Sequence, residues 1–491
     1  MAALKEKIYK SIKDPVCFTF ISSIALSLIA IFGTVTIGKD GAFYVDIARS
    51  ISSNGLSVAF DRFNWPWYSI LIAAIHNTTN FNHEFIAYLA TILFMAGTCS
   101  LTVSMVKRKN PEAVYWAVLL VLSVPVFNSF RAEIIRETGF WFFIILAIWL
   151  VFLDSKITFT KGLYIQLAIT TAALFRLEAL FVIPAVFIYL LFRQSSASEQ
   201  NRFVALFKCF YGFFFLFFLC ILAVLGTDFL AQPRIAQNLY LINPYNIYKS
   251  FVVVSDGFAQ TVLLKWSHSD AATIVFFGFL IALVIRIISY AGIVSLILLD
   301  TTGRKGLVEG AKNYKLNFIS MILYFIVLLV FFFQVKFINS RYSALLLILS
   351  VPILAVAVHN IKFKWPKLAN IFVFLSLLLM LSNVISTSTK KTHYLEAAHW
   401  IQENTKVTDK IYYEDSRVAY YADRGYPNMP LVTDIIKNKN YIDVYDYFVM
   451  ESDIENKTFL KWIEENKLII AAEQNNGKKT MFILTKRSLT S

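Results

Sequence analysis

The stretch GKDGAFYVDIAR, which runs from Gly38 to Arg49, decides how the rest of the chain is interpreted. It directly follows Pro15 to Ile37, an apolar run without a charged residue. About 20 helical residues, each rising 1.5 Å, cross the roughly 30 Å hydrocarbon core of a bilayer, so this run is long enough for a membrane span. Asp40 therefore stands where the chain leaves the membrane, and Asp46 follows shortly after it. Charged residues at such a boundary either mark the water interface or serve a function.

Composition indicates a polytopic membrane protein. Of the 491 residues, 57% are hydrophobic and only 16% are charged, whereas a soluble globular chain is about a quarter charged. From Lys390 onward there are 15 basic and 15 acidic residues, so the net charge of +14 lies entirely in the earlier, apolar part. Such an excess is typical of the positive-inside rule. No basic stretch interleaved with aromatic residues argues for a nucleic-acid partner.

The apolar part is expected to cross the membrane eleven times. The basic residues before the first span and in every second loop place the N-terminus in the cytoplasm and the C-terminus outside. Two of the runs are short, and only Arg176-Leu177-Glu178 separates them, so this turn should lie below the outer membrane surface. The eleven predicted spans are 15–37, 85–106, 113–130, 138–153, 162–175, 179–192, 209–227, 271–299, 318–333, 342–358 and 368–386.

Beyond residue 387 the pattern changes to that of a soluble α/β domain. Strands are expected at 410–414, 445–450, 468–472 and 480–485, with Asn476-Gly477 as a strong hairpin-turn signal between the last two. Helices are expected at 393–404, 417–423 and 459–465. The predicted architecture is therefore mainly α, with a transmembrane domain over 1–388 and a small extracytoplasmic α/β domain over 389–491.

The loops predicted to face outward contain many ionisable residues. Besides Asp40, they hold Arg131 and Glu133, Arg176 and Glu178, and Arg341, which Tyr342 follows. This mixture suits the transfer of a sugar from a polyprenyl phosphate. A carboxylate accepts the proton of the attacking hydroxyl, and arginine forks hold the departing phosphate. Structural alternatives stay open, because Arg176 and Glu178 can simply pair and Arg341 can snorkel to lipid headgroups.

The motifs in these loops resemble those of the GT-C glycosyltransferases, in particular the protein O-mannosyltransferases and the lipid A aminoarabinose transferases. Their first outer loop likewise carries an acidic residue, a tyrosine, a second acidic residue and Ile-Ala-Arg. Three later stretches resemble further family motifs in the same order, and together the four span about residues 15–360. These later stretches are FRAE at 130–133, FRLEAL at 175–180 with Pro184, and NSRY at 339–342 with Pro352.

The resemblance implies roles for particular residues. Asp40 would be the general base or the carboxylate that orients the acceptor, with Asp46 as a secondary catalytic candidate or a structural hydrogen-bond acceptor. Arg131, Arg176 and Arg341 would contact the phosphate, beside Tyr342, with Glu133 and Glu178 orienting the arginines. The family's common Asp-Glu pair is Asp40-Gly41 here, so the metal or acceptor contact that this Glu would make has no counterpart at position 41.

The implied function is a membrane glycosyltransferase, expected in a bacterial inner membrane. It would move a sugar, with inversion, from a polyprenyl-phosphate-linked donor to a protein, lipid or polysaccharide acceptor on the extracytoplasmic face. A divalent metal is possible, although His268 and Asp270 alone are too few ligands to define a metal site. The alternatives are a transporter or flippase of lipid-linked sugars, a polysaccharide polymerase or ligase, and a non-enzymatic scaffold.

Overall fold

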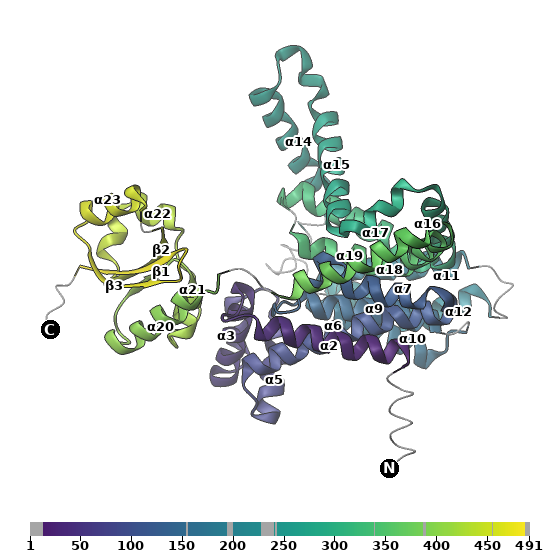
Figure 1. The fold of residues 1–491 in the computed structure, drawn as a ribbon, viewed down its shortest axis with the longest axis horizontal. Coiled ribbons are helices and arrows are strands. Elements are labelled where there is room, and N and C mark those ends of the chain that lie inside the picture. The colour runs from purple at the N-terminus through teal and green to yellow at the C-terminus, as the bar shows by residue number, and fades with distance from the viewer. Residues whose placement is uncertain are drawn as a thin grey trace. The chain divides into compact units, whose positions relative to one another are not determined.

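The computed structural model describes residues 13–153, 156–193, 200–226, 240, 243–337, 339–385, 389–453 and 455–486. The chain is mainly helical and divides into two compact units (Figure 1). Unit 1 comprises 1–28, 90–131 and 136–384, and unit 2 comprises 29–89, 132–135 and 385–491. The domain boundary near residue 388 that composition suggests stays a prediction.

Unit 1 contains the apolar helices except for the end of the first one, after residue 28, and the start of the second one, before residue 90, which belong to unit 2. Each of the eleven predicted spans falls on one or more of these helices. In the part of the chain that the structure describes, six helices are long and apolar enough to cross a membrane, and shorter apolar helices accompany them. The protein is therefore an integral membrane protein, while eleven crossings stay a prediction. The helices are α2 (Pro15–Phe32), α6 (His83–Lys109), α7 (Val114–Ser123), α8 (Pro125–Asn128), α9 (Glu137–Leu153), α10 (Phe159–Phe175), α11 (Val182–Leu191), α12 (Arg202–Gly226), α15 (Ala271–Ala291), α17 (Lys315–Val335), α18 (Ser340–Lys364) and α19 (Pro366–Val384).

Two helices of unit 1 lie in segments that the sequence predicts as loops. These are α14 (Pro244–Val262) and α16 (Thr301–Asn313). A Cβ atom on Gly306 would lie 2.6 Å from the backbone of Ala357, and one on Gly310 would lie 2.7 Å from the carbonyl oxygen of Ile353. The two glycines, four residues apart, therefore let α16 pack directly against the backbone of α18, as small residues do between membrane helices.

Short 3₁₀ segments join several of the helices. They are η1 (Pro111–Ala113), η2 (Leu177–Phe181), η5 (Lys265–Asp270) and η6 (Gly292–Leu299) in unit 1, and η7 (Lys439–Asp443) in unit 2.

Unit 2 combines the first loop with the C-terminal segment. The loop forms α3 (Lys39–Asn54), α4 (Ser57–Arg62) and α5 (Trp67–Thr79), and α5 follows an aromatic stretch at 63–68. The C-terminal segment contributes α20 (Thr392–Asn404), α21 (Ser416–Tyr421), α22 (Val432–Lys437) and α23 (Lys457–Glu465). Its strands are β1 (Ile411–Tyr413), β2 (Tyr447–Ser452), β3 (Ile469–Asn475) and β4 (Thr480–Thr485).

The four strands form one mixed sheet in the order β1-β2-β4-β3. β1 pairs with β2 in parallel, and the other two pairs are antiparallel. The β3–β4 hairpin turns at Gly477, whose φ of 84° favours glycine. Side chains alternate between two cores, so α20 and α21 cover one face and α22 and α23 cover the other (Figure 1). The predicted α/β character and the hairpin are confirmed, while α22 was not expected.

Candidate functional site

Unit 1 brings four charged residues and one tyrosine together, and we name this group the Arg176 cluster. It consists of Glu137, Arg176, Glu178, Arg341 and Tyr342. Each residue stands at or near the end of a helical element: α9 begins at Glu137, α10 ends just before Arg176, and Glu178 lies in η2. Arg341 and Tyr342 occupy the first turn of α18, whose N-cap Asn339 accepts a hydrogen bond from the Arg341 amide.

Arg176 is the most heavily bonded member of the cluster. Its Nη1 donates to Glu137 Oε1 over 2.6 Å, and its Nη2 donates to Glu178 Oε1 over 2.5 Å. The guanidinium also lies 4.3 Å from the ring centre of Tyr342. Arg176 is 7% exposed and the Glu137 side chain is 2% exposed. A guanidinium at this depth is stable only because two carboxylates and an aromatic face replace its lost hydration.

Arg341 joins the cluster through the same carboxylate. Its Nε lies 3.4 Å from Glu137 Oε1, and its guanidinium carbon lies 5.5 Å from the ring centre of Tyr342. Glu137 therefore contacts two arginines, and both stack over one tyrosine ring. Tyr324 of α17 fixes the start of α18, because its hydroxyl donates to the Tyr342 carbonyl over 3.0 Å. The Arg341 side chain is 22% exposed, so it is the more accessible of the two arginines.

The predicted group of ligand-binding residues is only partly assembled here. Arg176, Glu178, Arg341 and Tyr342 come together, as the hypothesis requires. Glu137 is the member that the sequence hypothesis left out of its candidates, although it lies in the same predicted outward loop as Arg131. No motif position identified it, because its importance rests on contacts with two residues that are distant along the chain.

Arg131 lies outside the Arg176 cluster and is fully buried. Its Nη1 donates to the carbonyl and hydroxyl oxygens of Ser23 and to the hydroxyl of Ser27, each at 2.9–3.0 Å. Its Nε donates to Asn128 Oδ1 over 2.8 Å. These contacts join α2 to the end of α8, so the geometry favours a packing role for Arg131 over contact with a phosphate.

The two aspartates of the first loop occupy different environments in unit 2. Asp40 lies half-buried in the first turn of α3, where the helix dipole stabilises a negative charge. Asp46 is buried: its Oδ2 accepts from Arg62 Nη2 over 2.6 Å and from the backbone amide of Tyr426 over 3.0 Å. Asp46 therefore connects the first loop to the C-terminal segment, and its contacts favour the structural role.

Glu133 also belongs to unit 2, where it lies against the N-cap of α3. A Cβ atom built on Gly38 would lie 2.1 Å from Glu133 Oε2. The absence of a side chain at Gly38 is therefore what lets this carboxylate approach the positive end of the helix. The contact places Glu133 beside the first turn of α3, which contains Asp40.

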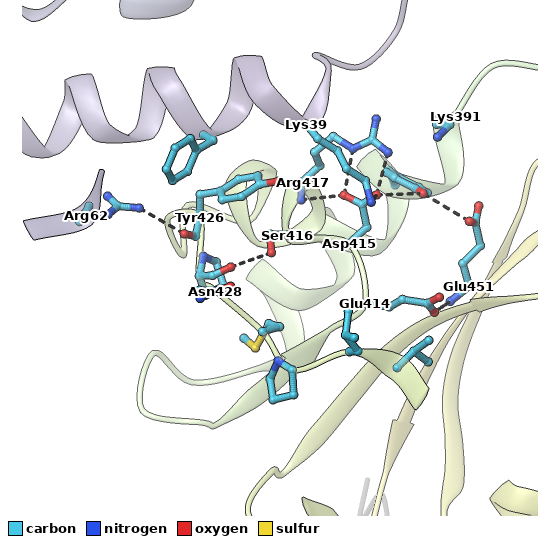
Figure 2. A pocket seen from close by; sticks show the side chains of 17 residues that line it. Lys39, Arg62, Lys391, Glu414, Asp415, Ser416, Arg417, Tyr426, Asn428 and Glu451 are labelled. Carbon is cyan, nitrogen blue, oxygen red and sulfur yellow. Dashed lines mark hydrogen bonds and ion pairs between the residues drawn. The ribbon is translucent and has the colours of Figure 1, made fainter. Parts of the chain in front are cut away.

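A cavity of about 670 Å³ opens in unit 2, and we name it the Asp415 cavity (Figure 2). Lys39 and Phe43 of α3 form one wall, and residues between Glu414 and Val432 form most of the rest. Asp415 lies in the wall, with its Oδ2 3.2 Å from Lys39 Nζ and 2.7 Å from Arg417 Nη2. Figure 2 shows these three side chains converging.

Burial and neighbouring charges together shift the pKa values of three groups that line this cavity. Burial alone would raise the pKa of Asp415, but the hydrogen bonds and charge of Arg417, with help from Lys39, lower that pKa to about 2. Burial raises the pKa of Glu414, and the neighbouring Glu451 adds to the rise. Burial and the negative charges of Asp415 and Asp40 raise the pKa of Tyr426 to about 12.

The arrangement of side chains in the described part of the chain gives no support for a metal site. Among the described residues, no three His, Cys, Asp or Glu side chains gather closely enough to hold a metal ion. His268 and Asp270 lie in the exposed segment η5. A role for a divalent metal stays a prediction.

Comparison with known proteins identifies the fold class. No protein-family model matches the sequence, and no curated protein matches it. The structure of ArnT from Cupriavidus metallidurans bound to undecaprenyl phosphate aligns with 95% of this chain and 97% of its own, with a TM-score of 0.54 and 11% sequence identity. The apo state of ArnT aligns over the same shares with a TM-score of 0.43.

The chain therefore has the membrane glycosyltransferase fold known as GT-C. ArnT is a lipid A aminoarabinose transferase, so the resemblance found in the sequence motifs is confirmed at the level of the fold.

Proposed function

We propose that this protein is a glycosyltransferase that uses a polyprenyl-phosphate-linked sugar as its donor. The observation that carries the proposal is the Arg176 cluster, in which two arginines share the carboxylate of Glu137 and stack on the ring of Tyr342. The GT-C fold supports it, because ArnT with the same fold has been solved with undecaprenyl phosphate. A protein, lipid or glycan would be the acceptor.

In this proposal the Arg176 cluster binds the phosphate of the carrier lipid. Arg341 makes the direct contact, because its side chain keeps an exposed surface and its planar fork matches phosphate oxygens. Arg176 is already bonded to two carboxylates, so its role is indirect. It adds positive charge close to the bound phosphate and holds Glu137 in place. The cluster contains two positive and two negative charges and is neutral by itself, so Arg341 would hold the phosphate through the directional hydrogen bonds of its fork and not through a net positive charge of the cluster.

The lipid tail would occupy an apolar cavity beside α18, the helix that carries Arg341 and Tyr342. This cavity of about 430 Å³ lies among α15, η6, α16, α17 and α18. Leu346 lines it and lies one turn beyond Tyr342 along α18, about 6 Å by the helical rise. A prenyl chain attached to a phosphate at Arg341 would therefore enter an apolar lining after one turn of helix.

In the proposed transfer step, Asp40 receives the proton of the acceptor hydroxyl. A hydroxyl oxygen of the acceptor attacks the anomeric carbon, the bond from this carbon to the phosphate oxygen breaks, and the carrier phosphate leaves with the electron pair. The hydroxyl proton passes to the Asp40 carboxylate, which acts as general base. Attack opposite the leaving phosphate inverts the anomeric configuration. Asp46 holds Arg62 and the Tyr426 amide, so it supports the loop that contains Asp40.

Orientation follows from the charge pattern. The N-terminus would be cytoplasmic, the C-terminal domain from about residue 389 would face outward, and a bacterial inner membrane is the proposed location. Asp40 and the ends of α10 and α17 would then face the extracytoplasmic side, where the lipid-linked donor is presented.

The test is transfer of radiolabelled sugar from polyprenyl-phosphate donors in membranes that contain wild type, Asp40→Asn or Arg341→Ala at matched protein levels. We expect wild type to transfer sugar and both variants to lose transfer. Asp61→Asn and Lys265→Ala, two exposed positions outside both sites, serve as matched controls that should retain it.

Failure takes two distinguishable forms. If wild type transfers no sugar from any donor but moves the labelled lipid across the bilayer of a proteoliposome, the protein is a flippase and the transferase proposal is wrong. If Asp40→Asn transfers as fast as wild type, the protein remains a transferase, but Asp40 is not the base.

A further inference from the structure

The Asp415 cavity has no part in the donor site, yet its wall includes the helix that carries Asp40. Lys39 and Phe43 of α3 line it. Asp40 and Phe43 are three residues apart on α3, so they lie on the same face of the helix. The negative charge of Asp40 also reaches Tyr426, another residue in the wall. The cavity therefore opens beside the carboxylate proposed as general base.

Most charges in the wall are already balanced by the protein itself. Asp415 pairs with Lys39 and Arg417, and Arg62 pairs with Asp46. Glu451 lies 2.9 Å from His393 Nε2. Because little net charge is left over, the cavity does not suit a polyanion such as a nucleic acid or an oligophosphate.

Two charged side chains in the wall, Glu414 and Lys391, form no ion pair within the part of the chain that the structure describes. Glu414 Oε2 accepts the backbone amide of Glu451 over 2.8 Å, and burial with its carboxylate neighbours raises the pKa of Glu414. Lys391 lies over the ring of Tyr394, 5.1 Å from its centre, and burial followed by the charge of Arg417 lowers its pKa. Figure 2 shows Glu414, Asn428 and Lys391 around the cavity. They provide a carboxylate, an amide and an ammonium group for hydrogen bonding.

Aromatic rings complete the wall. Phe43 and Tyr426 meet edge to face with ring centres 5.7 Å apart, and Tyr394 lines the cavity beside Lys391. Aromatic faces next to carboxylate and amide groups match a sugar ring, which has apolar C–H faces and a rim of hydroxyls. The volume of about 670 Å³ lies within the range of small-molecule sites and is large enough for a monosaccharide or disaccharide.

We propose that the Asp415 cavity binds a carbohydrate portion of the acceptor, so that the acceptor is a glycan or glycolipid and not a peptide. This inference rests on the proposed function, because it takes the bound sugar to be the group that presents its hydroxyl to Asp40. Glu414 accepts hydrogen bonds from sugar hydroxyls, Asn428 bridges neighbouring ones, and Phe43 and Tyr426 cover an apolar face of the ring.

The test measures binding without any donor, so that it does not depend on transfer. Full-length protein in lipid nanodiscs is examined by saturation-transfer NMR with methyl glycosides of glucose, galactose, mannose and N-acetylglucosamine, and with a short serine-containing peptide. We expect at least one glycoside to bind and the peptide not to bind. Glu414→Gln preserves the shape and the bond to the Glu451 amide, but it replaces a charged acceptor by a neutral one. It should weaken glycoside binding about five-fold.

A second variant and a control keep the test decisive. Asn428→Ala removes an exposed amide and should also weaken binding, whereas Glu473→Gln, an exposed change on β3, should leave it unchanged. The inference is overturned if no glycoside binds, if only the peptide binds, or if both cavity variants bind like wild type. Because donor transfer is measured separately, a protein that transfers sugar but binds no glycoside refutes only this inference. One that binds glycosides at the cavity but transfers nothing refutes the transferase proposal and with it the acceptor role, and leaves carbohydrate binding alone standing.

Discussion

Glu137 Oε1 lies 2.6 Å from Arg176 Nη1 and 3.4 Å from Arg341 Nε, so one buried carboxylate connects two arginines from separate helices. The three residues come from the start of α9, the end of α10 and the start of α18. Such a shared carboxylate fixes the spacing of the two guanidinium groups, which is the property that a phosphate site needs. Its removal should therefore affect both the stability of unit 1 and binding of the donor.

Glu137→Gln is expected to be the most destabilising charge change in the cluster. The substitution removes the charge that compensates two arginines, and breaking a buried ion pair typically costs about 3–5 kcal/mol. Glu178→Gln should cost less, because Glu178 is more exposed and pairs with Arg176 alone. A thiol-reactive dye that reports exposure of buried Cys99 and Cys209 on heating measures the difference. Equal unfolding temperatures for the two variants would contradict this ranking.

Arg341→Lys is expected to weaken the donor contact while it retains the positive charge. A lysine ammonium cannot make the paired hydrogen bonds of a guanidinium fork, so the donor KM should rise about ten-fold. If Arg341 only snorkels to lipid headgroups, lysine should replace it without loss. As a control, the KM for the acceptor is measured with the same variant, and we expect it to stay unchanged.

Asp40→Asn and Asp46→Asn should separate catalysis from structure. Loss of a general base lowers the rate about 10²–10⁴-fold, so Asp40→Asn should lose transfer but retain its unfolding temperature. Asp46→Asn loses the ion pair with Arg62 and weakens the bond from the Tyr426 amide. It should therefore lower the unfolding temperature as well. The reverse pattern would assign the catalytic part to Asp46.

The sequence was sufficient for the membrane character, the α/β domain and most members of the Arg176 cluster. Apolar runs and strand alternation are local signals, so the spans and the strands around Gly477 could be predicted. The segment TTGRKGLVEGAKN is predicted as a loop because it is charged and separates two apolar runs, yet its glycines allow α16 to pack against α18.

What the sequence could not supply were contacts between distant residues. Asp46 and the Tyr426 amide are 380 positions apart, and only the folded chain shows that they are bonded. The buried environment of Arg131, with Ser23 and Ser27 more than a hundred positions away, was equally hidden. The motif predicts Arg131 as a phosphate ligand, but a motif contains no information about burial, and the buried contacts favour a packing role. The Asp415 cavity was missed for the same reason, since its walls come from both ends of the chain.

Acid should destabilise unit 2 through Asp415. The pKa of this carboxyl in the folded protein is about 2, which is below its ordinary value near 3.9, so the folded state favours the ionised form. Its contribution of about 2 kcal/mol is present above pH 4 and is lost as the pH falls from about 4 to 2. The raised pKa of Glu414 acts in the opposite direction, because its protonation relieves repulsion from Glu451 and Asp415. Urea unfolding of wild type and Asp415→Asn between pH 6 and 2.5 measures the difference, and parallel curves would contradict the assignment.

Gly38 and Glu133 provide a test of how the first turn of α3 is positioned. Gly38 has a φ of −66° and a ψ of 159°, values that alanine adopts without strain, so Gly38→Ala acts only through the space that its Cβ occupies. This Cβ would meet Glu133 Oε2, the end of a flexible side chain, which can move away at small cost. We therefore expect Gly38→Ala to retain the unfolding temperature but to slow transfer, because the displaced carboxylate disturbs the turn that contains Asp40. Glu133→Ala removes the obstacle, so the double variant should be no slower than Glu133→Ala alone. Transfer rates of the four proteins form a double-mutant cycle, and strictly additive effects would mean that the two residues do not act through this contact.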